Sequence, residues 1–190
     1  MPTWAYIVIA VGVLVVLAAI AYIAYQARRR KQLQETKQLQ ETFGPEYERT
    51  VADAPTRKEA EAELLDRKKR HDELDITPLS PSSRDNYARQ WEKTQARFVD
   101  DPPGAINEAD DLIQQVMKER GYPVDDFDQR AADLSVEHPD VVEYYREGHS
   151  IARRNVHGDA DTEELRQAFK HYSELFAVLV QPSAEKAEAR

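Results

Sequence analysis

The sequence predicts an all-α protein with one N-terminal transmembrane helix, a helical stalk and a compact multi-helix domain. Residues 5–25 carry no charged side chain, whereas all 26 basic and all 35 acidic residues follow Ala27. Farther along, apolar residues recur every three or four positions, between residues typical of helix starts and Gly or Pro at the expected ends. We find no convincing β-strand pattern.

The uncharged run is long enough to cross a bilayer. As a helix, residues 5–25 would measure about 31 Å, close to the roughly 30 Å of a hydrocarbon core. Trp4 and Tyr6 near one end, and Tyr22 and Tyr25 near the other, are expected at the two headgroup levels. The run has no ionisable residue and no GxxxG motif, so we expect a simple anchor.

A cleaved secretory signal is the alternative, because Ala19, Ile20 and Ala21 resemble a small-residue cleavage site. A signal peptide has a positive segment before a short apolar centre, yet no Lys or Arg precedes Arg28. The basic cluster instead follows the run, as in a stop-transfer anchor. The positive-inside rule then predicts an external N-terminus and a cytoplasmic C-terminal domain. The cluster is a collar for anionic lipid headgroups, made of Arg28, Arg29, Arg30 and Lys31.

Charge separates this collar from the rest of the chain. Residues 41–190 hold 21 of the basic and 34 of the acidic residues, a net charge of −13. Anionic lipid would repel such a domain, so we expect it to stand off from the bilayer. The balance also argues against sequence-independent nucleic-acid binding, which needs a basic surface. The absence of cysteine excludes disulfides, thiolate metal sites and cysteine nucleophiles.

Composition divides the chain into five predicted segments. Residues 1–27 are the transmembrane anchor, and residues 28–43 the collar and a polar helical stalk of about 24 Å. The stalk repeats QLQETK as QLQETF, a six-residue period that holds no coiled-coil seam. Residues 44–79 predict a charged helical arm, solvated or lying on a surface, followed by a Pro-containing linker. Residues 80–180 predict the compact helical domain, and residues 181–190 a disordered tail.

Local signals predict where the helices begin and end. We expect the stalk to end at Gly44, and helices over residues 46–53 and from Thr56 to about residue 73. In the compact domain, helices should begin near Ser80, Asp101, Asp125, His138 and Asp161, with Gly121 as a stop signal. For His138, which precedes Pro139, helix capping is the simplest role.

No pattern in the chain predicts catalysis or metal binding. Asp126, Asp128 and Glu137 match three positions of a calcium-binding EF loop, but Arg130 and Ala131 stand where an oxygen ligand and glycine are needed. His149 and His157 bracket Arg153-Arg154 without the spacing of a two-histidine metal motif. We find no phosphate loop or nucleophile elbow. We therefore expect no catalytic residue, metal ligand or cofactor.

One long segment carries a resemblance. Residues 95–155 contain QARFVDDPPGA, VMKERGYPVDDF and QRAADLSVEHPDVVEYYREGH, and FGPEYERTV and ITPLSP precede them. This segment resembles an uncharacterised family of bacterial proteins that are membrane-anchored or secreted. The resemblance implies an all-helical domain and a bacterial origin, hence the inner membrane. It implies no activity and no catalytic residues.

These observations predict a non-catalytic protein-binding, adaptor or regulatory module at the membrane. Its expected partners are the lipid bilayer and an unidentified protein, not nucleic acid. Stiff aromatic and cationic side chains anchor interfaces, so the candidate contact residues are Trp91, Arg97, Tyr122, His138, Tyr144, Tyr145 and His149. The alternative for each aromatic is a place in the core. A membrane-anchored enzyme or metal-binding domain, and a purely structural stalk, remain open alternatives.

Overall fold

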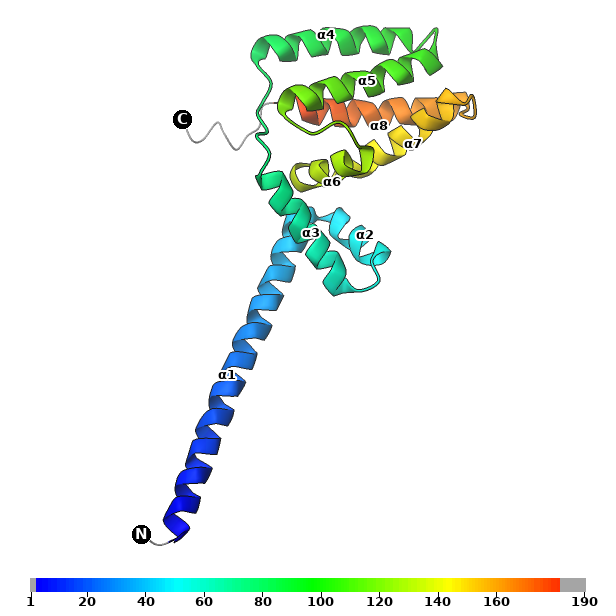
Figure 1. Ribbon diagram of the computed structural model, residues 1–190. Helices are drawn as coiled ribbons and strands as arrows, with labels where there is room; N and C mark the ends of the chain where they lie inside the picture. Colours follow the sequence, from blue (N-terminus) through cyan, green and yellow to red (C-terminus); the bar gives the residue numbers. More distant parts are fainter. Residues whose placement is uncertain (1–2, 182–190) are drawn as a thin grey trace. The chain divides into compact units, whose positions relative to one another are not determined.

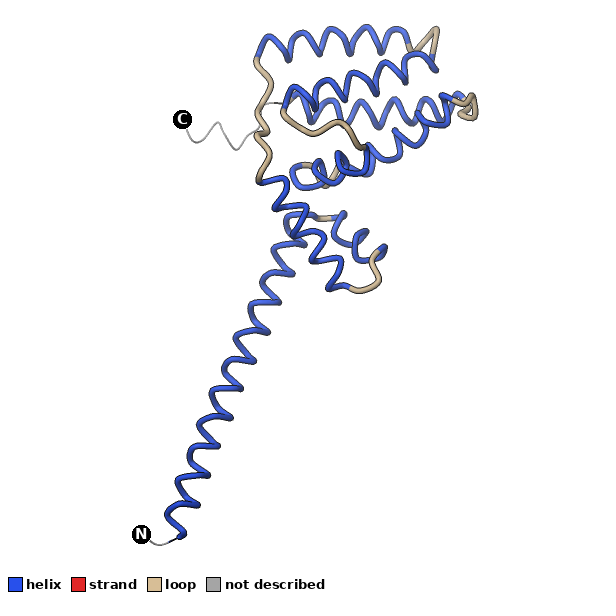
Figure 2. The backbone as a smooth tube through the Cα atoms, viewed as in Figure 1, coloured by secondary structure: helices blue, strands red, loops and turns tan. Residues whose placement is uncertain are grey.

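The computed structural model describes residues 3–181, apart from the side chains of residues 3–19, 21, 28 and 32. Every regular element in this part of the chain is an α-helix and none is a strand (Figures 1 and 2), which confirms the predicted all-α class. The helices fall into two compact units, residues 1–41 and residues 42–190. Each unit is described by itself.

Helix α1 (Thr3–Phe43) runs without a break through the residues of the predicted anchor and stalk. Tyr22 and Tyr25 are exposed, and Lys31 lies 3.8 Å from Glu35. Within the described residues, no helix has both the length and the apolar character needed to cross a membrane. Most side chains of the expected span, among them those of Trp4 and Tyr6, lie outside the part that the structure describes, as do the side chain of Arg28 and residues 182–190 of the predicted tail.

The second unit begins with two short helices, α2 (Pro45–Asp53) and α3 (Arg57–Asp72), which we call the α2–α3 hairpin. Gly44 turns the chain into α2 with a φ of 46°, a conformation that glycine adopts without a Cβ penalty. The predicted cap of α3 is confirmed, because the Thr56 side chain accepts a hydrogen bond from the Glu59 backbone N–H. Phe43, Tyr47 and Leu64 are buried.

The hairpin therefore belongs to the compact unit, which begins at Thr42, rather than standing apart as a solvated arm before residue 80. The reason lies in Ala60, Leu64 and Arg67, which follow one face of α3 and are all buried. A search for apolar residues along the sequence does not identify Arg67 as a core residue. Its charge is compensated by Glu46, so a helix with few apolar residues still has a face to bury.

The next two helices begin and end as the local signals predict. Helix α4 (Pro81–Arg97) is capped by Ser80, and α5 (Pro102–Arg120) by Asp101. Gly121 ends α5 in the left-handed conformation, with a φ of 102°. A Cβ on Gly121 would lie 2.4 Å from the Asp75 carbonyl oxygen, so only glycine lets the linker pass this close.

Three helices complete the chain: α6 (Phe127–Glu137), α7 (Val142–Val156) and α8 (Thr162–Val180). Helix α8 begins at the predicted Asp161, where Asp161 and Glu164 form a capping box. The predicted capping role of His138 at a helix start is wrong. Helix α7 starts at Val142 with no side-chain cap, and His138 instead ends α6, where its N–H donates to the Leu134 carbonyl.

Helices α4, α5, α8 and α7 lie side by side, with α5 between α4 and α8 (Figure 1). The core fills the space between them, where Trp91 of α4 stacks on Phe176 of α8 with ring centroids 4.4 Å apart. Tyr145 and Ala152 anchor α7 in this core. The adjoining face of α7 is thereby held in a fixed orientation, and it carries the candidate site.

Candidate anion-binding groove on helix α7

One face of α7 is lined with cationic and imidazole side chains. Arg146, His149, Arg153 and His157 follow one another at intervals of three or four residues, the spacing of neighbours on a helix surface. With the first turn of α6 they border a groove of about 410 Å³. Its walls are formed by Phe127, Asp128, Arg146, His149, Ser150, Arg153, Arg154 and His157.

Arginines outnumber carboxylates in the walls of the groove, although the domain around it is acidic. The groove holds three arginines against one carboxylate, that of Asp128. Arg154 is paired, with its Nη1 2.7 Å from Glu164 Oε1. Arg153 makes no ion pair or hydrogen bond with any residue that the structure describes. The groove therefore offers at least one guanidinium to an anion from outside.

His149 is held in place on two sides. Its ring stacks on Phe127, with centroids 3.8 Å apart and planes inclined by 11°. Its Nδ1 lies 3.6 Å from Oδ1 of Asp110, a carboxylate on α5. Because Nδ1 faces Asp110, Nε2 is the nitrogen left for the groove. At 3.6 Å Nδ1 makes no hydrogen bond with this carboxylate, so the contact is an ion pair only when the imidazole is protonated.

Asp110 is fixed by further hydrogen bonds. The Tyr172 hydroxyl donates to Oδ1 at 2.7 Å, and the Gln114 amide donates to Oδ2 at 2.7 Å. Burial alone would raise the pKa of Asp110, but His149, Tyr172 and Gln114 outweigh it and hold the pKa below its ordinary value. The carboxylate is therefore ionised at neutral pH. Tyr172 can reach it because Gly148 has no side chain: a Cβ there would lie 2.9 Å from Tyr172 Cε1.

Arg130 ties α6, and with it Phe127, to α7. Its Nε donates to the Tyr145 hydroxyl at 2.6 Å, and its Nη1 donates to the Val124 carbonyl at 2.5 Å. Burial is the main reason that the pKa of Tyr145 is raised to about 12, so this tyrosine stays protonated. The wall that Phe127 contributes to the groove is therefore part of the rigid bundle.

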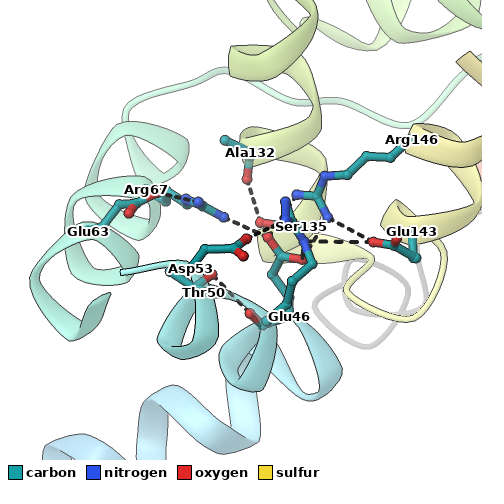
Figure 3. Close-up of polar contacts among 10 residues, drawn as sticks. Glu46, Thr50, Asp53, Glu63, Arg67, Ala132, Ser135, Glu143 and Arg146 are labelled. Atoms are coloured by element: carbon teal, nitrogen blue, oxygen red, sulfur yellow. Dashed lines mark hydrogen bonds and ion pairs between the residues drawn. The ribbon is translucent and has the colours of Figure 1, made fainter. Parts of the chain in front are cut away.

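Arg146 belongs to the groove and to a second network centred on Glu46 (Figure 3). The Glu46 side chain is only 1% exposed. Arg146 donates hydrogen bonds to both of its carboxylate oxygens, at 2.7 and 2.8 Å. Arg67 donates at 2.8 Å and Arg49 at 3.3 Å. Burial would raise the Glu46 pKa, but Arg146, Arg67 and Arg49 together hold it below its ordinary value. We call these four residues the Glu46 network.

The structure shows where the sequence-predicted contact residues lie. Trp91, Tyr122 and Tyr145 are buried in the core, the alternative left open for the aromatics. Tyr144 is 40% exposed and stacks on His171. Arg97 is exposed at the C-terminal end of α4, where it pairs with Asp101 and Glu108. Of the predicted set, His149 alone lines the groove.

The remaining predicted residues lie elsewhere. His138 is half-buried beside Glu137, which also accepts the Tyr122 hydroxyl hydrogen bond. In the collar, Arg29, Arg30 and Lys31 are exposed. Whether any of these residues meets lipid or a partner stays a prediction.

Sequence reasoning missed Asp110, Arg146 and Glu46. One signal was available: the interval of three or four residues that joins Arg146, His149, Arg153 and His157 on one helix face. Asp110 had no signal, because it meets His149 only after the bundle has folded. Among the described residues, no group of three His, Asp or Glu side chains is arranged to hold a metal ion.

Comparison of the chain with protein-family models, with curated proteins and with solved structures finds no match.

Proposed function

We propose that this protein is a membrane-anchored, non-catalytic binding module that docks an acidic segment of a protein partner in the α7 groove. The observation that carries the proposal is Arg153, a guanidinium with no partner among the described residues, in a basic groove on an acidic domain. A guanidinium can bind a carboxylate through two parallel hydrogen bonds. Arginine is also one of the residues most enriched at binding hot spots.

A short acidic segment suits the groove better than nucleic acid. A long polyanion would extend beyond the groove over a region of net charge −13, where repulsion opposes binding. A peptide carboxylate needs only the groove itself. Phe127 adds apolar wall surface beside the arginines, which favours a segment that mixes acidic and apolar residues.

The anchor is part of the same proposal. Residues 5–25 would cross the inner membrane, with the collar on the cytoplasmic side and the N-terminus outside. The uncharged length and the basic cluster that follows it support this orientation. In right-side-out vesicles, protease added outside should leave the compact unit intact. Digestion of that unit without lysis would contradict the orientation.

Docking can be tested with the full chain in nanodiscs of zwitterionic lipid and a fluorescent hexaglutamate peptide. We expect Arg153→Glu to weaken binding at least tenfold in fluorescence anisotropy. Arg89→Glu is the matched control, because Arg89 is an exposed arginine on α4 and the charge change is the same. The control should change the affinity less than twofold. Absence of binding, or an equal loss in both variants, would remove the groove as the docking site.

A second candidate is acid–base catalysis, favoured by the position of His149, whose Nδ1 lies 3.6 Å from the Asp110 carboxylate. In that function Nε2 would accept a proton from water during hydrolysis of an anionic ester, with Arg153 binding the anion. A panel of carboxylic and phosphate esters tests this. Turnover should disappear in His149→Asn and fall in Asp110→Asn. A wild-type rate equal to that of buffer would exclude this function for the panel.

A further inference from the structure

Arg146 is shared between two sites in the compact unit. It lines the α7 groove, and it also holds both carboxylate oxygens of Glu46 on α2. Glu46 thus binds Arg146 through a carboxylate, the same group by which the proposed acidic ligand would bind in the groove. The two carboxylates would compete for one guanidinium.

The Glu46 network also fastens α2 to α7. Two ion pairs join these helices: Glu46 with Arg146, and Arg49 with Glu143 at 3.7 Å. Helix α3, by contrast, packs on α6. Loss of the contact with Arg146 would therefore loosen α2 from α7 while α3 stays packed against the bundle.

We infer that Glu46 is a built-in competitor for the groove, which an acidic ligand displaces from Arg146, and that this exchange releases helix α2 from α7. The inference rests on the proposed docking function and adds its regulation. Displacement does not leave Glu46 as an isolated buried charge, because Arg67 (Figure 3) and Arg49 of its own hairpin still hold it. That retained pairing distinguishes Glu46 from an ordinary buried ion pair, whose separation leaves both charges without a partner.

Coupling of this kind acts equally in both directions. Removing the Glu46 charge should therefore improve ligand binding, and bound ligand should loosen α2. With hexaglutamate as the probe and the full chain in zwitterionic nanodiscs, we expect Glu46→Gln to bind three- to tenfold more tightly than wild type. Glu108→Gln is the matched control, because Glu108 pairs with exposed Arg97 away from the groove, and its affinity should change less than twofold.

Amide hydrogen exchange on the wild-type chain gives a second readout that needs no variant. Saturating hexaglutamate should speed exchange over residues 45–53 at least threefold and leave residues 57–72 unchanged. If the peptide binds in an Arg153-dependent way but neither Glu46→Gln affinity nor α2 exchange rises, the inference fails and the docking function stands. If α2 becomes protected instead, the coupling has the opposite sign and the inference is overturned. If the peptide does not bind, both fail.

Discussion

Two glutamates in the compact unit gather cationic side chains from different helices, but they are built differently. The Glu46 side chain is 1% exposed and is held by three arginines. The Glu137 side chain, at the end of α6, is 30% exposed. It accepts hydrogen bonds from the Tyr122 hydroxyl at 2.5 Å and from Arg120 at 3.2 Å.

Two imidazoles complete the surroundings of Glu137, namely His71 at 3.9 Å and His138 at 3.6 Å. Among the described residues, the buried atoms without a hydrogen-bond partner include His71 Nε2, His138 Nε2 and Arg120 Nε, and none belongs to the Glu46 network. A fully satisfied network contributes to rigidity, whereas a partly satisfied one contributes less. The arginines around Glu46 are permanently charged, whereas the charge of His138 beside Glu137 depends on pH.

The largest expected effect comes from Glu46→Ala. It leaves the largely buried Arg67 and Arg146 with only the exposed carboxylates of Glu63 and Glu143. Loss of one partner of a buried ion pair costs about 3–5 kcal/mol in free energy of unfolding, and these remaining carboxylates favour the lower end of that range. Trp91 fluorescence in urea, in a Trp4→Phe background, measures this. The control is Glu48→Ala, an exposed residue of the same helix, for which we expect a change below about 0.5 kcal/mol. Equal changes in free energy of unfolding for the two variants would show that the Glu46 network does not contribute to stability as proposed.

A smaller effect is expected from Tyr122→Phe, which deletes one hydrogen bond to Glu137. A hydrogen bond to a charged group contributes about 1.5–3 kcal/mol, and the exposure of Glu137 favours the lower end of that range. Burial and the nearby Glu137 charge raise the pKa of Tyr122, so its hydroxyl is a donor at all relevant pH values. Tyr144→Phe, at an exposed tyrosine, should change stability by less than about 0.5 kcal/mol. A loss from Tyr122→Phe as large as that from Glu46→Ala would remove the proposed difference between the two networks.

These two networks also mark the limit of what the sequence could predict. Helix starts at Thr56, Ser80, Asp101 and Asp161 were predictable because each cap acts on a backbone N–H three residues away. Arg146 and Glu46 are 100 residues apart, and no local pattern links them. The burial of Arg67 on the α3 face depends on a second non-local pair, Arg67 with Glu46, which are 21 residues apart. The basic face of α7 could be seen in its spacing, but the carboxylate behind His149 could not.

The smallest expected effect is a difference between the two networks in how their contribution to stability depends on pH. Burial, helped by Arg120 and His71, lowers the pKa of His138 below its ordinary value of 6.5, against the opposing influence of Glu137. The folded state therefore binds fewer protons here than the unfolded state, so stability is lost as pH falls from about 6.5 towards the folded-state pKa. The Glu46 pKa is also lowered, but from 4.5, so its contribution is lost only in more acidic solution.

Between pH 7.5 and 5.5 the Glu137 surroundings should therefore weaken while the Glu46 network does not. Urea unfolding of the otherwise wild-type chain in the Trp4→Phe background, followed by Trp91 fluorescence, should show a lower midpoint at pH 5.5 than at pH 7.5. His138→Gln should show a smaller decrease, because its amide does not titrate. His157→Gln, at an exposed histidine, should keep the wild-type decrease. If His138→Gln loses as much stability as the wild type over this range, the proton is taken up elsewhere and His138 does not distinguish the two networks.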